Sequence, residues 1–136
     1  MNKKNKISLK AEEKDSVKYY LVMIKALIMA LLLSLILVIA YALLLSFTSL
    51  SDATMSIVTQ SITIISIAFS SIYAGKKIGN KGWIYGLILG LTFIFILTPI
   101  NILLGQAINI DKFFAVKTLM GSTVGLIGGI IGVNLK

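Results

Sequence analysis

The feature that most constrains this chain is a continuous apolar run from Ala26 to Thr48, which contains no charged residue. A helix over its 23 residues, at about 1.5 Å per residue, is roughly 34 Å long and crosses a hydrocarbon core of about 30 Å. Ala40-Tyr41-Ala42 resembles a signal-peptide cleavage site. The run continues beyond that site, whereas signal-peptide cores have only about 7–15 residues. It therefore predicts a transmembrane helix that is retained.

Three more apolar runs follow, and the composition agrees with a membrane protein. Hydrophobic residues make up 57% of the chain and charged residues 13%, which is too apolar for an ordinary soluble domain. Residues 1–18 form a polar, basic segment too short to fold alone, and residues 19–136 form the transmembrane domain. We expect an all-α, polytopic membrane protein, a bundle of four transmembrane helices at about residues 26–48, 54–74, 83–104 and 113–135.

The placement of the lysines predicts the orientation of the bundle. All 13 basic residues are lysines, and with five acids they give a net charge of +8. They concentrate in the first 18 residues, in the loop after the second run and at the carboxyl end, whereas the other two loops carry Asp52 in one and Asp111 with Lys112 in the other. Because lysines favour cytoplasmic loops, both termini and the central loop are expected to be cytoplasmic in a cell-membrane protein. Charge confined to such short gaps is not the pattern of a nucleic-acid binder.

The central loop, within "YAGKKIGNKGWIYGLILG" at residues 73–90, holds three lysines among several glycines. A phosphate-binding P-loop is excluded, because Asn80 replaces its second glycine and Gly82 replaces its hydroxyl residue. We expect a tight hairpin turn between two helices, permitted by Gly75 and Gly79. Four residues are expected to contact anionic lipid headgroups on the cytoplasmic side and to fix the orientation: Lys76, Lys77, Lys81 and Trp83.

All 11 glycines lie after residue 74, and two series of them recur every four residues. In a membrane, small residues at this spacing let two helix backbones approach closely, as in a glycine zipper. We expect the third and fourth spans to present flat faces to each other or to another subunit. The predicted helix-packing residues are Gly82, Gly86, Gly90, Gly121, Gly125 and Gly129, with Gly128 and Gly132 as an overlapping pair.

The first two spans differ in character. The first is rich in leucine and lacks glycine, so we expect large side chains all round and a place at the lipid-exposed rim. The second carries a stripe of small polar residues three or four positions apart, with Gln60 beside it. The side chains of this stripe either form hydrogen bonds with neighbouring helices or line a polar pathway. Its members are Ser56, Thr59, Thr63, Ser66 and Ser70.

Further residues belong to the candidate polar pathway, each with a simpler explanation beside the functional one. Pro99, with Asn101 close to it, either kinks or ends the third helix near the outer interface, or exposes carbonyls to an ion. Lys117, one turn inside the fourth span, either snorkels to the surface or points into the bundle with Asp111 as a partner. The candidate pathway therefore consists of Ser66, Ser70, Pro99, Asn101 and Lys117.

The residue inventory argues against an enzyme. The chain has no His and no Cys, so imidazole and thiol catalysts and Cys/His metal ligands are excluded. No acid lies deep in a predicted span, which argues against proton-coupled transport. We expect no catalytic, cofactor-binding or metal-binding residue.

Three segments resemble one known family. "AGKKIGNKGWIYGLILG", "LLLSFTSLSD" after the first span and "GLIGGIIGVNL" in the last span are similar to the YrzE-like family of small integral membrane proteins, found mainly in Firmicutes. The resemblance extends from about Lys25 to Lys136. It implies a four-helix membrane protein of a Gram-positive bacterium, and it implies neither an activity nor a catalytic residue.

These observations favour a non-enzymatic membrane protein, a structural or interaction subunit that assembles with itself or a membrane partner through its glycine faces. A small transporter or channel is the alternative, motivated by the polar stripe and the candidate pathway. A holin-like pore former is a weaker alternative, because it shares the small size and basic tail but rarely has four spans. No cofactor and no nucleic-acid partner is expected.

Overall fold

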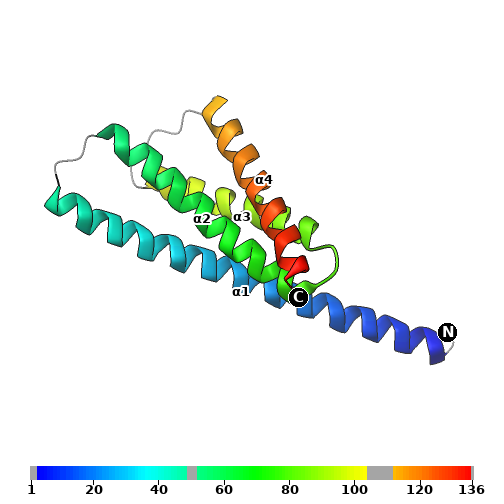
Figure 1. Ribbon diagram of the computed structural model, residues 1–136. Coiled ribbons are helices and arrows are strands. Elements are labelled where there is room, and N and C mark those ends of the chain that lie inside the picture. The colour runs from blue at the N-terminus through cyan, green and yellow to red at the C-terminus, as the bar shows by residue number, and fades with distance from the viewer. Residues whose placement is uncertain (1–2, 49–51, 104–111, 136) are drawn as a thin grey trace.

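The computed structural model describes residues 3–48, 52–103 and 112–135, and these ranges are helical apart from short connections (Figure 1). All four helices are long and apolar enough to cross a membrane, so the predicted all-helical fold with four candidate spans is confirmed. Their bounds are α1 Lys3–Phe47, α2 Asp52–Ile78, α3 Gly82–Leu103 and α4 Lys112–Asn134.

Helix α1 is longer than the span predicted within it. It has 45 residues, and its first part includes residues 3–18 of the polar segment in one continuous helix with the apolar run. Residues 7–18 are all exposed, and this end of α1 extends well beyond the other three helices (Figure 1). The part of α1 before Tyr19 is called the arm below.

Helix α2 also continues further than predicted, and this corrects the expected turn. Gly75 was expected to belong to the turn, but it lies inside α2 and is buried. The turn begins at Gly79, which has a left-handed φ of 76° and donates its backbone N–H to the carbonyl oxygen of Gly75 at 2.9 Å. This is the usual glycine ending of a helix, in which one hydrogen bond satisfies a terminal carbonyl. Lys81 adopts a left-handed φ of 55° immediately before α3.

The four helices are not packed symmetrically. Helix α2 contacts α1, α3 and α4, whereas no Cα atom of α1 lies within 8 Å of a Cα atom of α4 among the described residues. Helices α2 and α4 lie close together near the carboxyl-terminal end of α4 and separate towards its other end (Figure 1). The tightest packing is therefore at the end of the bundle that carries the turn at residues 79–81, called the turn end below.

The buried side chains of the core come from α1, α2 and α3, and α4 packs against them through Phe114 and Val124. The core shows that one expectation about α1 was wrong. Large side chains were expected all round this helix, but its buried positions are Ala26 and Ala30, which are 0% and 1% exposed. These two small residues pack in clusters with buried side chains of the other helices, among them Ile67 and Phe93. Alanines four positions apart lie on one face, so they allow α1 to approach the bundle closely.

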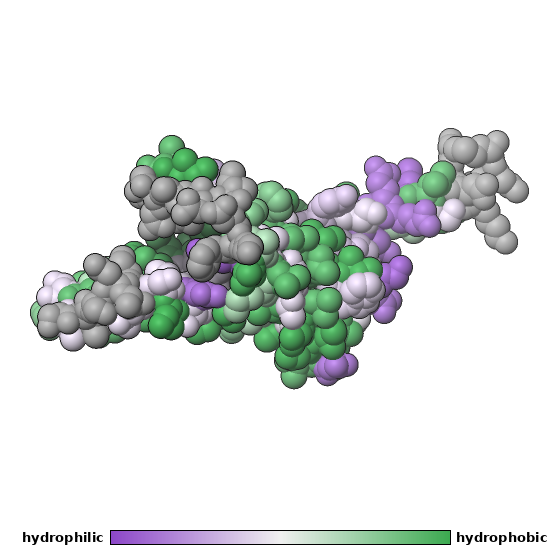
Figure 2. All heavy atoms as spheres, turned by 90° about the horizontal axis from the view of Figure 1, so that it is seen from above, coloured by the Kyte–Doolittle hydropathy of each residue, from purple (hydrophilic) through white to green (hydrophobic). Residues whose placement is uncertain are grey.

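The outer surface of the bundle is mostly apolar. Viewed from above, hydrophobic side chains cover most of the body, and hydrophilic ones gather on the arm (Figure 2). On helix α1, for example, large apolar side chains are exposed along most of the length, including Ile28, Leu32 and Leu43 at 50%, 54% and 59%. In water such a surface is unfavourable, whereas in a bilayer it contacts lipid tails.

Candidate functional site

The predicted glycines of α3 and α4 face each other inside this one chain. A Cβ atom added at Gly86 would overlap the carbonyl oxygen of Gly125, and one added at Gly125 would overlap the carbonyl oxygen of Gly86. In the same way, a Cβ added at Gly90 would overlap the carbonyl oxygen of Gly121, and one added at Gly129 would overlap the carbonyl oxygen of Gly82. All six predicted glycines are buried. At Gly86, Gly90, Gly125 and Gly129 the two backbones therefore pass so closely that a Cβ does not fit without movement of a helix, whereas at Gly121 it would overlap the side chain of Ile94.

This close approach supplies the attraction that hydrophobic burial does not supply in lipid. Lipid tails are as apolar as leucine side chains, so helices associate in a membrane through van der Waals contact and interhelical hydrogen bonds. Each atom pair contributes only about 0.1–0.2 kcal/mol, but two backbones in contact over several turns add many pairs. Of the alternatives that the sequence left open, the structure has the glycine faces meeting each other within the chain.

A second glycine face on α4 packs against α2. A Cβ at Gly128 would lie 2.9 Å from the Cβ of Ser71 and 3.0 Å from the carbonyl oxygen of Ala68. A Cβ at Gly132 would overlap the carbonyl oxygen of Ile72. Gly75 of α2 contributes to this packing, because its own Cβ would overlap the carbonyl oxygen of Gly129. Helix α4 therefore uses small residues on two sides, one against α2 and one against α3.

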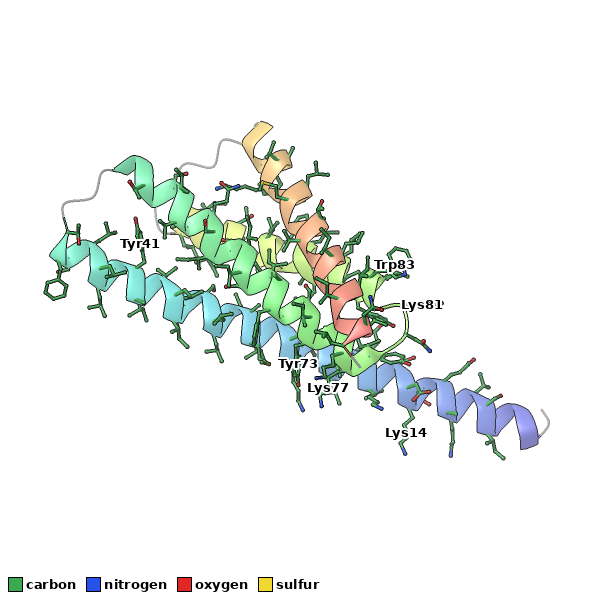
Figure 3. The ribbon with its side chains drawn as sticks, in the orientation of Figure 1. Lys14, Tyr41, Tyr73, Lys77, Lys81 and Trp83 are labelled. Atoms are coloured by element: carbon green, nitrogen blue, oxygen red, sulfur yellow. The ribbon has the colours of Figure 1, made fainter. Side chains whose placement is uncertain are left out.

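Three of the four residues predicted to contact headgroups, Lys77, Lys81 and Trp83, lie at the turn end in Figure 3. Lys76 and Lys77 occupy the last turn of α2, where a positive charge interacts favourably with the helix dipole. Both are exposed, as are Lys81 in the turn and Trp83, at 49%, in the first turn of α3. The rings of Tyr19 and Tyr85 pack at 5.7 Å between centroids at the same end of the bundle. Aromatic side chains beside lysines are typical of a membrane–water interface.

Comparison with known proteins places this arrangement in a family. The family described as "Protein of unknown function (DUF3792)" matches residues 19–132. The chain belongs to the DUF3792 family. No curated protein and no solved structure matches it. The YrzE-like name and the origin in Firmicutes stay predictions.

The DUF3792 match begins at Tyr19, where the arm ends. It therefore covers all the glycine contacts between α2, α3 and α4, together with the turn and its lysines. The arm precedes the matched residues.

The polar stripe of α2 is divided between two environments. Ser56 and Thr59, towards the start of α2, are exposed, whereas Ser66 and Ser70, towards its end, are buried. Several hydroxyl groups donate to carbonyls of α2 itself, as Thr63 does to Thr59 at 3.0 Å and Ser70 to Ile67 at 3.0 Å. These two bonds satisfy the hydroxyls of Thr63 and Ser70 inside their own helix.

Three polar side chains in or beside this stripe have a weak hydrogen-bond partner or none. The Gln60 amide donates from Nε2 to Met120 Sδ of α4 at 3.2 Å, and a thioether is a weak acceptor. The hydroxyl oxygens of Ser66 and Ser71 are buried and have no hydrogen-bond partner. A buried unpaired hydroxyl costs roughly 1–3 kcal/mol, so this part of α2 is less well satisfied than its surroundings.

The residues of the candidate pathway are not brought together. Ser66 and Ser70 are buried, whereas Pro99 and Lys117 are exposed, and the side chain of Asn101 lies outside the described residues. Helix α3 continues past Pro99 to Leu103, so the proline does not end it. Ser66 and Ser70 are thus the members of the candidate pathway that lie inside the bundle among the described side chains.

The position of Lys117 decides between its two explanations. The glycines one and two turns further along α4, Gly121 and Gly125, are buried against α3, but Lys117 is exposed. An exposed lysine near the end of a span is the snorkelling arrangement. Asp111, its expected partner, lies outside the described residues. Among those residues, no group of three or more His, Cys, Asp or Glu side chains gathers as metal ligands.

Proposed function

We propose that this protein is a non-enzymatic integral protein of the cell membrane that acts as a structural or interaction subunit, with both termini in the cytoplasm. The observation that supports this proposal is the reciprocal contact between the glycines of α3 and α4. It builds a closely packed bundle from backbone contacts, without chemically reactive side chains at the interface. The absence of His and Cys from the sequence agrees with a role other than catalysis.

The glycine contacts also change how such a subunit assembles. Gly86 and Gly125 are buried against each other within the chain, so they hold this bundle together and leave no flat glycine face for a second copy. An assembly with another copy or with a partner subunit then uses the outer apolar surface of α1 and the exposed sides of α3 and α4.

The packing part of the proposal is tested by Gly86→Leu and Gly125→Leu, each made separately. Each leucine side chain must displace a helix backbone, and overpacking a fitted interface costs about 1–3 kcal/mol or more. We expect a lower Tm in detergent, followed by the fluorescence of Trp83. Ala115→Leu is the matched control, because Ala115 is an exposed residue of α4. Equal Tm values for all three variants and the wild type would contradict the packing.

The assembly part is tested separately, by native mass spectrometry of the protein extracted in a mild detergent. We expect species heavier than the 14.7 kDa chain, either multiples of it or complexes with one membrane partner. A monomer that brings no partner from its own membrane at any detergent strength would overturn this part, whatever the glycine variants show.

A transporter or channel is the second candidate, and one observation favours it. Ser66 and Ser71 keep unpaired hydroxyls in the interior, and such groups bind a passing ion or polar solute more readily than satisfied ones. Flux into proteoliposomes that falls in Ser66→Ala, with Ser61→Ala on the exposed side of α2 as control, would support it. Solutes and ions that do not cross would leave the subunit role as the better proposal.

A further inference from the structure

A row of exposed residues runs along α1 and changes from basic to apolar. Lys14, Lys18 and Lys25 are separated by four and seven positions, and Ile28 and Leu32 continue the row three and seven positions further on. Residues at these spacings lie on one face of a helix. All five are exposed, whereas the alanines that attach α1 to the bundle lie on another side. The row therefore faces away from the other helices.

The spacing of this row matches the layers of a bilayer. A hydrocarbon core that begins at Ala26 places Lys25 at its edge and Lys18 about 10 Å further out, at about 1.5 Å per residue. The headgroup layer on each side is roughly 5–8 Å thick. Lys18 and Lys25 thus lie on either side of the headgroups, and Ile28 and Leu32 lie beside the first part of the acyl chains.

Helix α2 has a similar row on its exposed side. Ile65 and Phe69 are 53% and 57% exposed, and Lys76 lies seven positions after Phe69 at the turn end. Lys77 and Lys81 add two more exposed positive charges at this end, where Figure 3 also shows Lys14 and Lys77 extending outwards. The sequence has no acid between Asp52 and Asp111, so no carboxylate of that stretch neutralises these lysines.

We propose that these two rows bind anionic phospholipids, with the headgroup phosphate at the lysines and one acyl chain along the apolar residues of the row. The occupant is indicated by charge complementarity and by the order of basic and apolar residues, which follows the order of phosphate and hydrocarbon in a phospholipid. Each lysine near the surface attracts an anionic lipid by about 1 kcal/mol, which corresponds to a preference of about five-fold. This binding does not depend on the proposed subunit role.

The chain has one tryptophan, and this makes a direct test possible. In a Trp83→Phe background, Ile28→Trp places the only tryptophan on the α1 row. The purified protein is reconstituted in bilayers of phosphatidylcholine and phosphatidylglycerol, one of which carries brominated acyl chains that quench tryptophan fluorescence on contact. We expect phosphatidylglycerol to be preferred by about five-fold or more, and the preference to fall close to one in Lys18→Gln/Lys25→Gln.

The matched control is Leu43→Trp in the same background, because Leu43 is an exposed residue of α1 at the far end from the lysines. Here we expect no preference, with or without the lysine changes. Raising the salt from about 0.1 M to about 1 M shortens the Debye length from about 10 Å to about 3 Å and should remove the preference at Ile28→Trp. Equal quenching by both lipids there at low salt overturns the proposal, and so does a preference that survives the loss of Lys18 and Lys25.

Discussion

At the scale of single residues, the turn between α2 and α3 depends on Gly79. Its φ of 76° is a left-handed conformation that glycine adopts without steric cost. Residues with a Cβ lose roughly 1–2 kcal/mol in this region, and asparagine is the side chain that tolerates it best.

We therefore expect Gly79→Ala to lower the free energy of unfolding by about 1–2 kcal/mol, and Gly79→Asn to lower it by clearly less. Both can be measured as changes in Tm in detergent by the fluorescence of Trp83. Asn80→Ala is the control, because Asn80 is an exposed neighbour in the same turn with no left-handed φ. If Gly79→Ala and Gly79→Asn have the same Tm, the left-handed φ at position 79 is contradicted.

Gly75 shows what the residue pattern alone does not decide. Gly75 and Gly79 are four positions apart, and both were expected in the turn, but only Gly79 is there. Spacing by four is equally typical of a helix-packing face and of two glycines that flank a turn. What distinguishes them is the backbone of Gly129, which is far away in the sequence and packs against Gly75 in the structure.

At the scale of elements, α1 is attached to the bundle through small residues that were not expected from its leucine-rich sequence. Ala26, Ala30 and Ser34 recur every four positions, which is the same signal as the glycine series with larger members. The abundance of leucine around them concealed it. The fully buried positions of α1 are Ala26 and Ala30, and the side chains of α1 that pack in their clusters range from Tyr19 to Leu31, so the attachment is centred on the middle of the helix.

Ala30→Leu is expected to push α1 away from α2 and α3 and to lower the free energy of unfolding by about 1–3 kcal/mol. Ala30 is 1% exposed and packs in one cluster with Ile67 and Phe93, which leaves no room for three more carbon atoms. Thermal unfolding in detergent measures the change. Ala40→Leu, at an exposed position of the same helix, should leave the Tm unchanged; a drop of equal size there would point to a general effect on α1.

The spans themselves were predictable because bilayer thickness sets the length of an apolar run. The observed helices contain each predicted span within the described residues, except that α1 ends at Phe47, one residue before Thr48, and α4 at Asn134, one before Leu135. The continuation of α1 through residues 3–18 was not predictable in this way. Residues 7–18 are exposed on all sides, so no apolar period indicates a helix there.

At the scale of the whole molecule, the lysines predict an orientation that the contacts within the chain do not test. Lys76, Lys77 and Lys81 cluster at the turn end, the same end as the base of the arm. Lysines are retained on the cytoplasmic side of a membrane, so the turn and both termini are proposed to lie there.

The absence of cysteine from the sequence allows this to be tested with single introduced thiols. Asn80→Cys in the turn should react with a membrane-impermeant maleimide only after the cells are permeabilised. Thr48→Cys, exposed after the opposite end of α1, should react in intact cells. The reverse labelling pattern would invert the orientation and would also move the proposed lipid rows to the outer leaflet.

The candidate pathway illustrates what sequence spacing leaves out at this scale. Ser66 and Ser70 were expected to share a path with Lys117, but the serines are buried and the lysine is exposed. Spacing along a helix fixes which residues share its face, whereas the neighbour of that face depends on how the helices cross. Lys117 shares a face of α4 with Gly121 and Gly125, but α4 separates from α2 towards its first residues, and Lys117 is exposed there.

Because α4 packs against both α2 and α3, these two helices lack one of their packing partners until α4 has been synthesised. Gly75 on α2 and Gly82, Gly86 and Gly90 on α3 pack against α4, which follows them in the chain. At about 5–20 residues per second, roughly 2–6 s pass between translation of Leu103 and of Asn134. During that interval the nascent protein presents small-residue faces that any neighbouring membrane helix of similar shape can occupy. Helix α4, which is made after α2 and α3, thus protects these helices from foreign pairing.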